Sequence, residues 1–261
     1  MVPLEIFFLV MSFIWGAVWG SFANVVIYRL PEMEKGDKKL SLSKPGSYCP
    51  KCGNTLKAYH NIPLLSYIFL RGRCGFCGVG ISIRYPLVEL AAGALSMAAW
   101  LYIAYNPLVP NLITALVMHS FIFYLLLSLV VISFMDLEHK RIWNLTVIPP
   151  IFFGIFLNYF YGEYTGVSFL DSLIGSASGA GLVMLIWLFY RYVRKYEGIG
   201  LGDSILLALL GAYLGWHALP FIMLAGSLQG ILYAVGLRLT GQLDGPFMRQ
   251  DIPFGPFLVL A

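Results

Sequence analysis

The sequence is poor in charged residues, which make up 11% of its 261 positions, whereas hydrophobic residues make up 59%. A water-soluble domain of this length needs a far more polar surface, so the shortage of charge excludes an ordinary soluble fold. Long apolar runs recur instead, each close to the roughly 20 residues needed to cross about 30 Å of hydrocarbon. The composition therefore predicts an all-α polytopic membrane protein.

The apolar runs predict seven membrane-spanning helices, at about residues 5–28, 86–105, 112–135, 145–162, 169–190, 203–218 and 220–240. The first run lacks a basic start and a clear small-residue cleavage site, and it contains Trp15 and Trp19. These features distinguish it from a secretory signal peptide. We therefore expect it to be a retained membrane helix.

Lysine and arginine are missing from every second connection between these runs. All 17 lie in the other connections: ten between Arg29 and Arg84, then Lys140 and Arg141, three between 191 and 195, and Arg238 and Arg249. By the positive-inside rule, the basic connections face the cytoplasm and the N-terminus faces the opposite side of the membrane. The net charge of +4 then reflects orientation in the lipid bilayer, and no nucleic-acid partner is predicted.

Cysteine is absent outside residues 29–85, which form the one long polar segment. There it occurs as two C-x2-C pairs separated by 21 residues, Cys49 with Cys52 and Cys74 with Cys77. Two such turns facing each other complete a tetrahedral thiolate shell for Zn²⁺. Two disulfides are disfavoured in the reducing cytoplasm, and a redox pair remains an alternative. We expect one structural zinc ion per chain, with His60 a loop residue and not a ligand.

Acidic residues are also scarce, 13 in all, and an ionised carboxylate in hydrocarbon is costly enough to indicate function. Asp136 closes the third predicted helix and Asp203 opens the sixth, both from the cytoplasmic side. If these helices are neighbours, the two carboxylates can share a proton and activate water for peptide hydrolysis. Glu89, about one turn inside the second helix, is a candidate polar residue near the insert.

Two glycines precede Asp203, in the tract "GLGD" at residues 200–203. Gly200 and Gly202 carry no side chains, so an extended substrate could approach the backbone at this point. The alternative is a plain loop and helix start in which Asp203 is only a capping acid. Both interpretations are compatible with the sequence.

Together these motifs resemble the type IV prepilin peptidases, a bacterial family of GxGD-type intramembrane aspartic proteases. The similarity extends over nearly the whole chain in seven ordered blocks: "GSFANVVIYRLP", "CPKC" with "NIPLLSYIFLRGRCGFC", "IRYPLVEL", "DLEHKRIWN", "GLGD", "LLGAYLGWHALP" and "PFGPFL". GLGD alone is a weak signal, but seven blocks in this order are highly specific.

The resemblance implies an enzyme that cleaves the leader of prepilins or pseudopilins after a glycine on the cytoplasmic side, and methylates the new N-terminus with S-adenosylmethionine. Asp136 and Asp203 match the catalytic aspartates, and the four cysteines match the zinc tetrad. The implied domains are a first membrane helix (1–28), a zinc insert that contributes to methyl transfer (29–85) and the peptidase domain (86–261). The family has an eighth helix after "PFGPFL", whereas this sequence ends at Ala261.

Two further departures leave alternatives open. Ile205 stands where the family commonly has lysine, and Trp143 stands where it commonly has proline. An inactive peptidase-like scaffold is therefore one alternative. An ion-coupled transporter is another, and it would place its acids near the bilayer midplane. Preflagellin substrates are disfavoured because the relatives that process them generally lack the four-cysteine insert.

Overall fold

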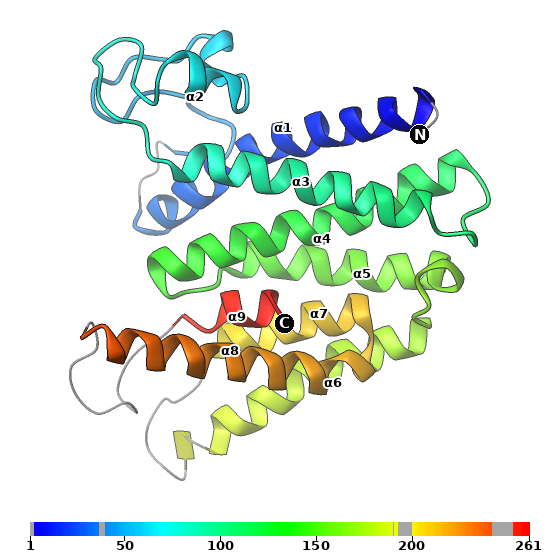
Figure 1. Ribbon diagram of the computed structural model, residues 1–261. Helices are drawn as coiled ribbons and strands as arrows, with labels where there is room; N and C mark the ends of the chain where they lie inside the picture. Colours follow the sequence, from blue (N-terminus) through cyan, green and yellow to red (C-terminus); the bar gives the residue numbers. More distant parts are fainter. Residues whose placement is uncertain (1–2, 37–39, 190, 193–199, 242–252) are drawn as a thin grey trace. The chain divides into compact units, whose positions relative to one another are not determined.

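The structure is a computed structural model that describes residues 3–36, 40–189, 191–192, 200–241 and 253–261 (Figure 1). Within these ranges the secondary structure is helical, with two isolated β-bridges and no strand. The chain divides into two compact units, Met1–Val131 and Ile132–Ala261. Helix α4 (Leu112–His139) begins in the first unit and ends in the second.

In the first unit, the long helix α1 (Pro3–Glu34) packs against α3 (Arg84–Ala104). Small residues allow the close approach: a Cβ added to Gly20 would lie 2.8 Å from the Cα of Glu89, and one added to Gly16 would meet the backbone carbonyl of Ala92. Between membrane helices, such glycines let two backbones come into van der Waals contact. This packing fixes the N-terminal half of α3, which carries Glu89.

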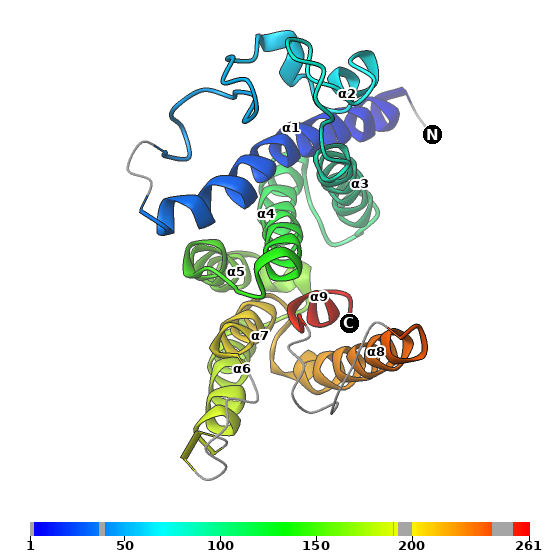
Figure 2. The same ribbon diagram turned by 90° about the vertical axis from the view of Figure 1, so that its left-hand side faces the viewer.

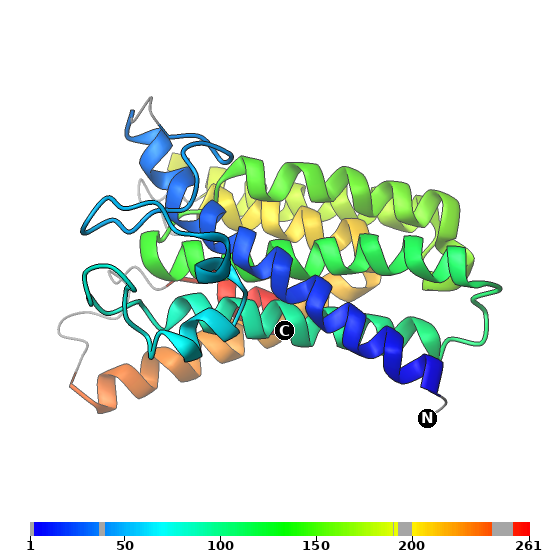
Figure 3. The ribbon, with the colours of Figure 1, turned by 90° about the horizontal axis from the view of Figure 1, so that it is seen from above.

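The segment between α1 and α3 forms a small insert at the end of the pair where α1 finishes and α3 begins (Figure 3). It contains the 3₁₀ turn η1 (Ala58–Asn61), the short helix α2 (Leu65–Phe69) and two cysteine-bearing turns. Arg29 anchors its first part, donating hydrogen bonds from its guanidinium to the carbonyls of Ser41 at 2.8 Å and Gly46 at 3.3 Å. Arg29 therefore has specific partners in the first part of the insert.

The second unit is arranged around α7 (Figure 2). Its elements are the end of α4, α5 (Asn144–Thr165), α6 (Phe169–Phe189), α7 (Leu201–Leu214), η3 (Trp216–Ala218), α8 (Leu219–Leu239) and α9 (Gly255–Val259). Nearly every residue of α7 from Ser204 to Tyr213 is buried. Both α5 and α6 pack on α7, and α9 contacts α7 and α8.

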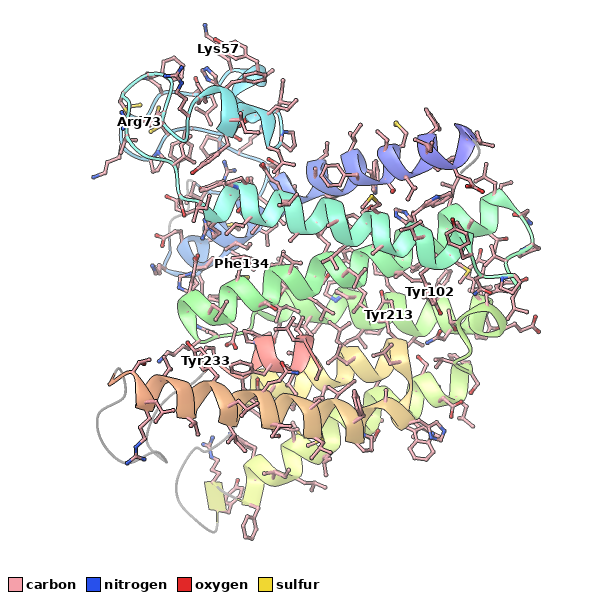
Figure 4. All side chains as sticks on the ribbon, viewed as in Figure 1. Lys57, Arg73, Tyr102, Phe134, Tyr213 and Tyr233 are labelled. Carbon is pink, nitrogen blue, oxygen red and sulfur yellow. The ribbon has the colours of Figure 1, made fainter. Side chains whose placement is uncertain are left out.

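Glycines bring α5 and α6 close to α7. The ring of Tyr213 (labelled in Figure 4) occupies the place that a side chain at Gly154 of α5 would need. Gly175 of α6 and Gly211 of α7 are in mutual contact, so a Cβ on either would meet the backbone carbonyl of the other. The hydroxyl of Ser172 on α6 reinforces this packing by donating a hydrogen bond to the carbonyl of Ala212 on α7. This packing holds α7, and with it Asp203, in a defined position within the unit.

The prediction of an all-α polytopic membrane protein is confirmed. Six helices in the described part of the chain are long and apolar enough to cross a membrane. The run expected at 203–218 corresponds to α7, an apolar helix of only 14 residues, so the count of seven spans stays a prediction. Helix α1 continues to Glu34, through Pro31 and past the boundary expected at residue 28, because the end of a helix need not coincide with the end of its apolar run.

Candidate functional site

Asp136 lies in the last turn of α4 and is 6% exposed. The turn is closed by Lys140, which has a left-handed backbone (φ 52°) and donates its N–H to the carbonyl of Asp136 at 2.8 Å. Left-handed residues commonly end helices because they redirect the chain while satisfying a free carbonyl. The helix end therefore presents the Asp136 carboxylate from a fixed backbone.

A second segment reaches the same carboxylate from the C-terminal end of the chain. The backbone N–H of Gly255, at the start of α9, donates a buried hydrogen bond to Oδ2 of Asp136 at 2.9 Å. Gly255 lies in the block "PFGPFL", to which sequence reasoning gave no role. A contact between residues 119 positions apart leaves no periodicity or spacing that could have revealed it.

Asp203 lies in the first turn of α7, directly after the extended residue Gly200. Its carboxylate accepts a hydrogen bond from the backbone of Gly200 and is close enough to Asp136 for the two charges to interact. The structure thus brings together the two acids that the sequence singled out. Both lie at helix ends, not at mid-helix as the transporter alternative would require.

The two motif glycines have different surroundings. A Cβ at Gly202 would lie 3.0 Å from the Cβ of Ile142, in the connection between α4 and α5. Among the described residues, the nearest atom to a Cβ at Gly200 would be Oδ2 of Asp203, at 3.5 Å. Gly202 therefore permits the close approach of α7 to the α4–α5 connection, whereas Gly200 lies beside the Asp203 carboxylate. The role of these glycines in substrate access stays a prediction.

Two carboxylates that interact electrostatically, as those of Asp136 and Asp203 do, have a specific chemical capability. Two like charges in a partly buried site do not ionise independently, so the pair holds one proton over a range of pH. The ionised member can remove a proton from water while the protonated member donates to a carbonyl oxygen. The arrangement in α4 and α7 is thus suited to peptide hydrolysis without a covalent intermediate.

The four cysteines of the insert form one cluster, as the spacing predicted. Their sulfur atoms all lie within 4.8 Å of one another, and the Sγ atoms of Cys49 and Cys77 are 3.9 Å apart. Zn–S bonds of about 2.3 Å in a tetrahedron require S···S edges of about 3.8 Å. The cluster therefore fits a single tetrahedral metal ion, and His60 lies outside it.

The two cysteine turns are built alike. In the first, Gly53 donates to the carbonyl of Cys49 at 2.8 Å, and in the second Gly78 donates to that of Cys74 at 2.9 Å. Both glycines have left-handed backbones, with φ of 71° and 70°. Hydrogen bonds from the backbone amides of Cys77 and Phe76, with the neighbouring Cys49 thiol, lower the pKa of Cys74 to about 7. The Cys74 thiolate, held by amides in this way, is prepared for a metal ion.

Glu89 is 8% exposed on α3 and contacts the insert. Its carboxylate accepts a hydrogen bond from the backbone N–H of Leu64 at 2.8 Å and one from the side chain of Ser21 on α1. Leu64 has a left-handed backbone (φ 62°), which is unfavourable for leucine. Glu89 therefore anchors a strained turn of the insert, and its suggested role towards a cofactor stays a prediction.

The two departures from the family pattern lie near the acids. Ile205 is half-buried on α7. Trp143 precedes α5 and packs its ring against the guanidinium of Arg141 at 5.5 Å and the ring of His139 at 5.6 Å. The tryptophan thus orders the connection that follows Asp136 through an edge-to-face contact and a cation–π contact, where a proline would restrict the backbone directly.

Comparison with known proteins identifies the family. Residues 14–103 match the Bacterial Peptidase A24 N-terminal domain, and residues 122–235 match the Type IV leader peptidase family. No solved structure matches the chain.

Curated relatives extend the match to nearly the whole chain. A "Prepilin leader peptidase/N-methyltransferase" of Pseudomonas putida is 35% identical over 98% of this chain and 88% of its own length. Proteins of the same name from Aeromonas salmonicida (34% identical, 95% and 87% covered) and Burkholderia pseudomallei (38% identical, 96% and 82% covered) are similar. The chain belongs to the type IV leader peptidase family.

Proposed function

We propose that this enzyme removes the leader peptide from type IV prepilins or pseudopilins after a glycine, and then methylates the new N-terminal amine. The names of its relatives support both activities. The observation that carries the peptidase assignment is the meeting of Asp136 and Asp203 at adjoining helix ends.

In the proposed cleavage, the Asp136/Asp203 dyad activates a water molecule that attacks the scissile carbonyl carbon. One carboxylate takes the water proton and the other protonates the carbonyl oxygen, giving a tetrahedral intermediate. The protonated carboxyl then donates to the amide nitrogen, which leaves as the amine, and the other carboxylate takes a hydroxyl proton from the intermediate. The pair is left with the single shared proton with which it began. We expect the extended backbone around the cleavage site to lie beside Gly200, next to the Asp203 carboxylate.

We place the enzyme in the bacterial inner membrane, with its N-terminus in the periplasm and its insert and aspartates on the cytoplasmic side. The alternation of basic and uncharged connections supports this orientation. We divide the chain into a first membrane helix (1–28), the zinc insert (29–85) and the peptidase domain (86–261).

Cys49, Cys52, Cys74 and Cys77 would hold one structural Zn²⁺, which would tie the two cysteine turns together. An insert of this size builds only a marginal hydrophobic core, so we attribute its order to metal binding. S-adenosylmethionine would supply the methyl group for the second activity. The contact of Glu89 with the insert makes α3 the element we associate with that activity.

The peptidase assignment is tested with full-length protein in detergent and a prepilin that carries its leader. Asp136→Asn and Asp203→Asn should each abolish cleavage, because either change removes one member of the proton-sharing pair. Asp171→Asn is the matched control: this half-buried acid accepts hydrogen bonds from Ser168 and Trp216 and takes no part in the dyad. Cleavage that survives either dyad substitution refutes the mechanism.

Methyl transfer is tested separately with labelled S-adenosylmethionine and a precleaved pilin. Wild type and both dyad variants should transfer label, because methylation does not use the water-activating pair. Absence of transfer by protein that cleaves normally would remove the second activity from the proposal and leave the first intact. If the wild-type protein shows neither cleavage nor methyl transfer, the result would favour the alternatives of an inactive scaffold or a transporter.

A further inference from the structure

The start of α9 contributes a backbone group to the acid pair. The N–H of Gly255 donates to Oδ2 of Asp136 at 2.9 Å, and this hydrogen bond is buried. A buried hydrogen bond to a carboxylate is stronger than one between neutral groups and fixes the direction of the acceptor oxygen. Because Asp136 also interacts with Asp203, the amide limits how the two carboxylates can be oriented towards each other.

Glycine is required at this position for a steric reason. A Cβ on residue 255 would lie 2.8 Å from Oδ2 of Asp136 and 3.3 Å from its Cγ. Both distances are shorter than van der Waals contact allows, so one side must move. Any other residue would therefore displace the carboxylate or break its hydrogen bond.

Helix α9 is held on its other sides, so it has little freedom to move away. Leu258 is 1% exposed. The ring of Phe257 packs against Tyr233 of α8 with ring centres 5.3 Å apart (Figure 4). A Cβ at Gly226 of α8 would lie 3.2 Å from the carbonyl oxygen of Phe257. With α9 packed this closely, a side chain at residue 255 would be accommodated by movement of Asp136.

We propose that Gly255 is a positioning residue of the peptidase site. Its amide orients the Asp136 carboxylate for proton exchange, and its missing side chain leaves that carboxylate room. This inference rests on the proposed function, because it assigns the consequence of the contact to cleavage. It adds a third segment of the chain to the site formed by α4 and α7.

The test is the steady-state cleavage of a prepilin by full-length Gly255→Ala in detergent. We expect kcat to fall about 10- to 100-fold, the range for a lost hydrogen bond to a charged group or a slightly misplaced catalytic group. KM should stay within about threefold of wild type, since Gly255 acts through Asp136 and not through substrate binding. A wild-type kcat for Gly255→Ala overturns the inference.

Two glycines of α8 provide controls for a general disturbance of α9. Gly226→Ala introduces a Cβ 3.1 Å from Leu258, whereas Gly230→Ala places one at an ordinary 3.5 Å from Phe257. Neither touches Asp136, so both should keep kcat near wild type. If Gly226→Ala lowers kcat as much as Gly255→Ala, the effect is one of packing and the inference fails.

Gly255→Ala could also prevent folding, which thermal unfolding in detergent would reveal. In that case, an ester at residue 255, made by incorporating glycolic acid, removes the N–H without adding a side chain. It should lower kcat by about tenfold or more, and an unchanged kcat overturns the inference. Asp136→Asn separates the two proposals. If the Asp136→Asn protein still cleaves prepilin, the proposed dyad mechanism is wrong. If Asp136→Asn is inactive and Gly255→Ala has a wild-type kcat, only the inference about Gly255 fails.

Discussion

The hydrogen bond between Glu89 and the insert gives a prediction whose size follows from the structure. Leu64 has a left-handed backbone (φ 62°), which costs about 1 kcal/mol for a residue with a side chain. Its N–H donates to the buried Glu89 carboxylate at 2.8 Å, and hydrogen bonds to charged groups contribute about 1.5–3 kcal/mol. Glu89→Ala should therefore lose most of the energy that holds this turn in place.

Amide hydrogen exchange at Leu64 measures that loss directly. Since about 1.4 kcal/mol corresponds to a factor of ten in an equilibrium constant, Glu89→Ala should speed exchange of this amide about 10- to 100-fold. Glu89→Gln is the matched control, because its amide oxygen can still accept the hydrogen bond and exchange should change only a few-fold. Unchanged exchange in Glu89→Ala would show that the carboxylate does not hold the turn.

The same pair of variants separates anchoring from cofactor chemistry. If Glu89 only anchors the insert, Glu89→Gln should keep methyl transfer, measured with labelled S-adenosylmethionine and a precleaved pilin. If the negative charge itself is used, Glu89→Gln should lose methyl transfer while Leu64 remains protected. Loss of transfer in Glu89→Ala alone therefore indicates a structural role.

Three other changes have expected outcomes. Gly202→Ala should lower prepilin cleavage by pushing α7 away from Ile142. Adding Ile142→Ala to the same chain should restore part of the lost cleavage. A double variant that cleaves no better than Gly202→Ala would contradict this packing argument. Metal analysis should give about one zinc per chain. Chelators should remove this zinc faster at pH 6 than at pH 8, because protons compete with the metal for thiolates such as Cys74, whose pKa is about 7. A removal rate that does not depend on pH would argue against thiolate ligands. Gly211→Ala should destabilise the protein by about 1–3 kcal/mol, since its Cβ would meet the backbone of Gly175; an unchanged thermal midpoint in detergent would show that α6 and α7 can separate at no cost.

The sequence singled out the two acids and the four cysteines because each residue type is rare where it occurs. Few carboxylates lie near apolar runs, so Asp136 and Asp203 stood out, and the structure brings them into electrostatic contact. Cysteine spacing is a local property, so Cys49 and Cys74 could be assigned to facing turns before any fold was known. Local composition was sufficient for these features.

Contacts between distant segments were beyond the sequence. Nothing in the spacing relates Gly255 to Asp136 or Leu64 to Glu89, because each hydrogen bond depends on how helices and loops pack. Hydropathy also missed the end of α7: the apolar run continues to residue 218, but Gly215 has a φ of 76° and starts a new turn. Hydropathy averages do not detect such backbone conformations.

The shortness of α7 has a consequence for how water and substrate reach the enzyme. Its 14 residues extend about 21 Å at 1.5 Å per residue, about 9 Å less than the hydrocarbon thickness of a typical bilayer. A helix of this length matches the bilayer only if the lipid thins around it or one end stays below the headgroups. With Asp203 in its first turn, the hydrolysis that we propose would then take place at a local depression in the membrane surface. In the proposed orientation, water would enter this depression from the cytoplasm, and a membrane-anchored substrate would not need to leave the lipid.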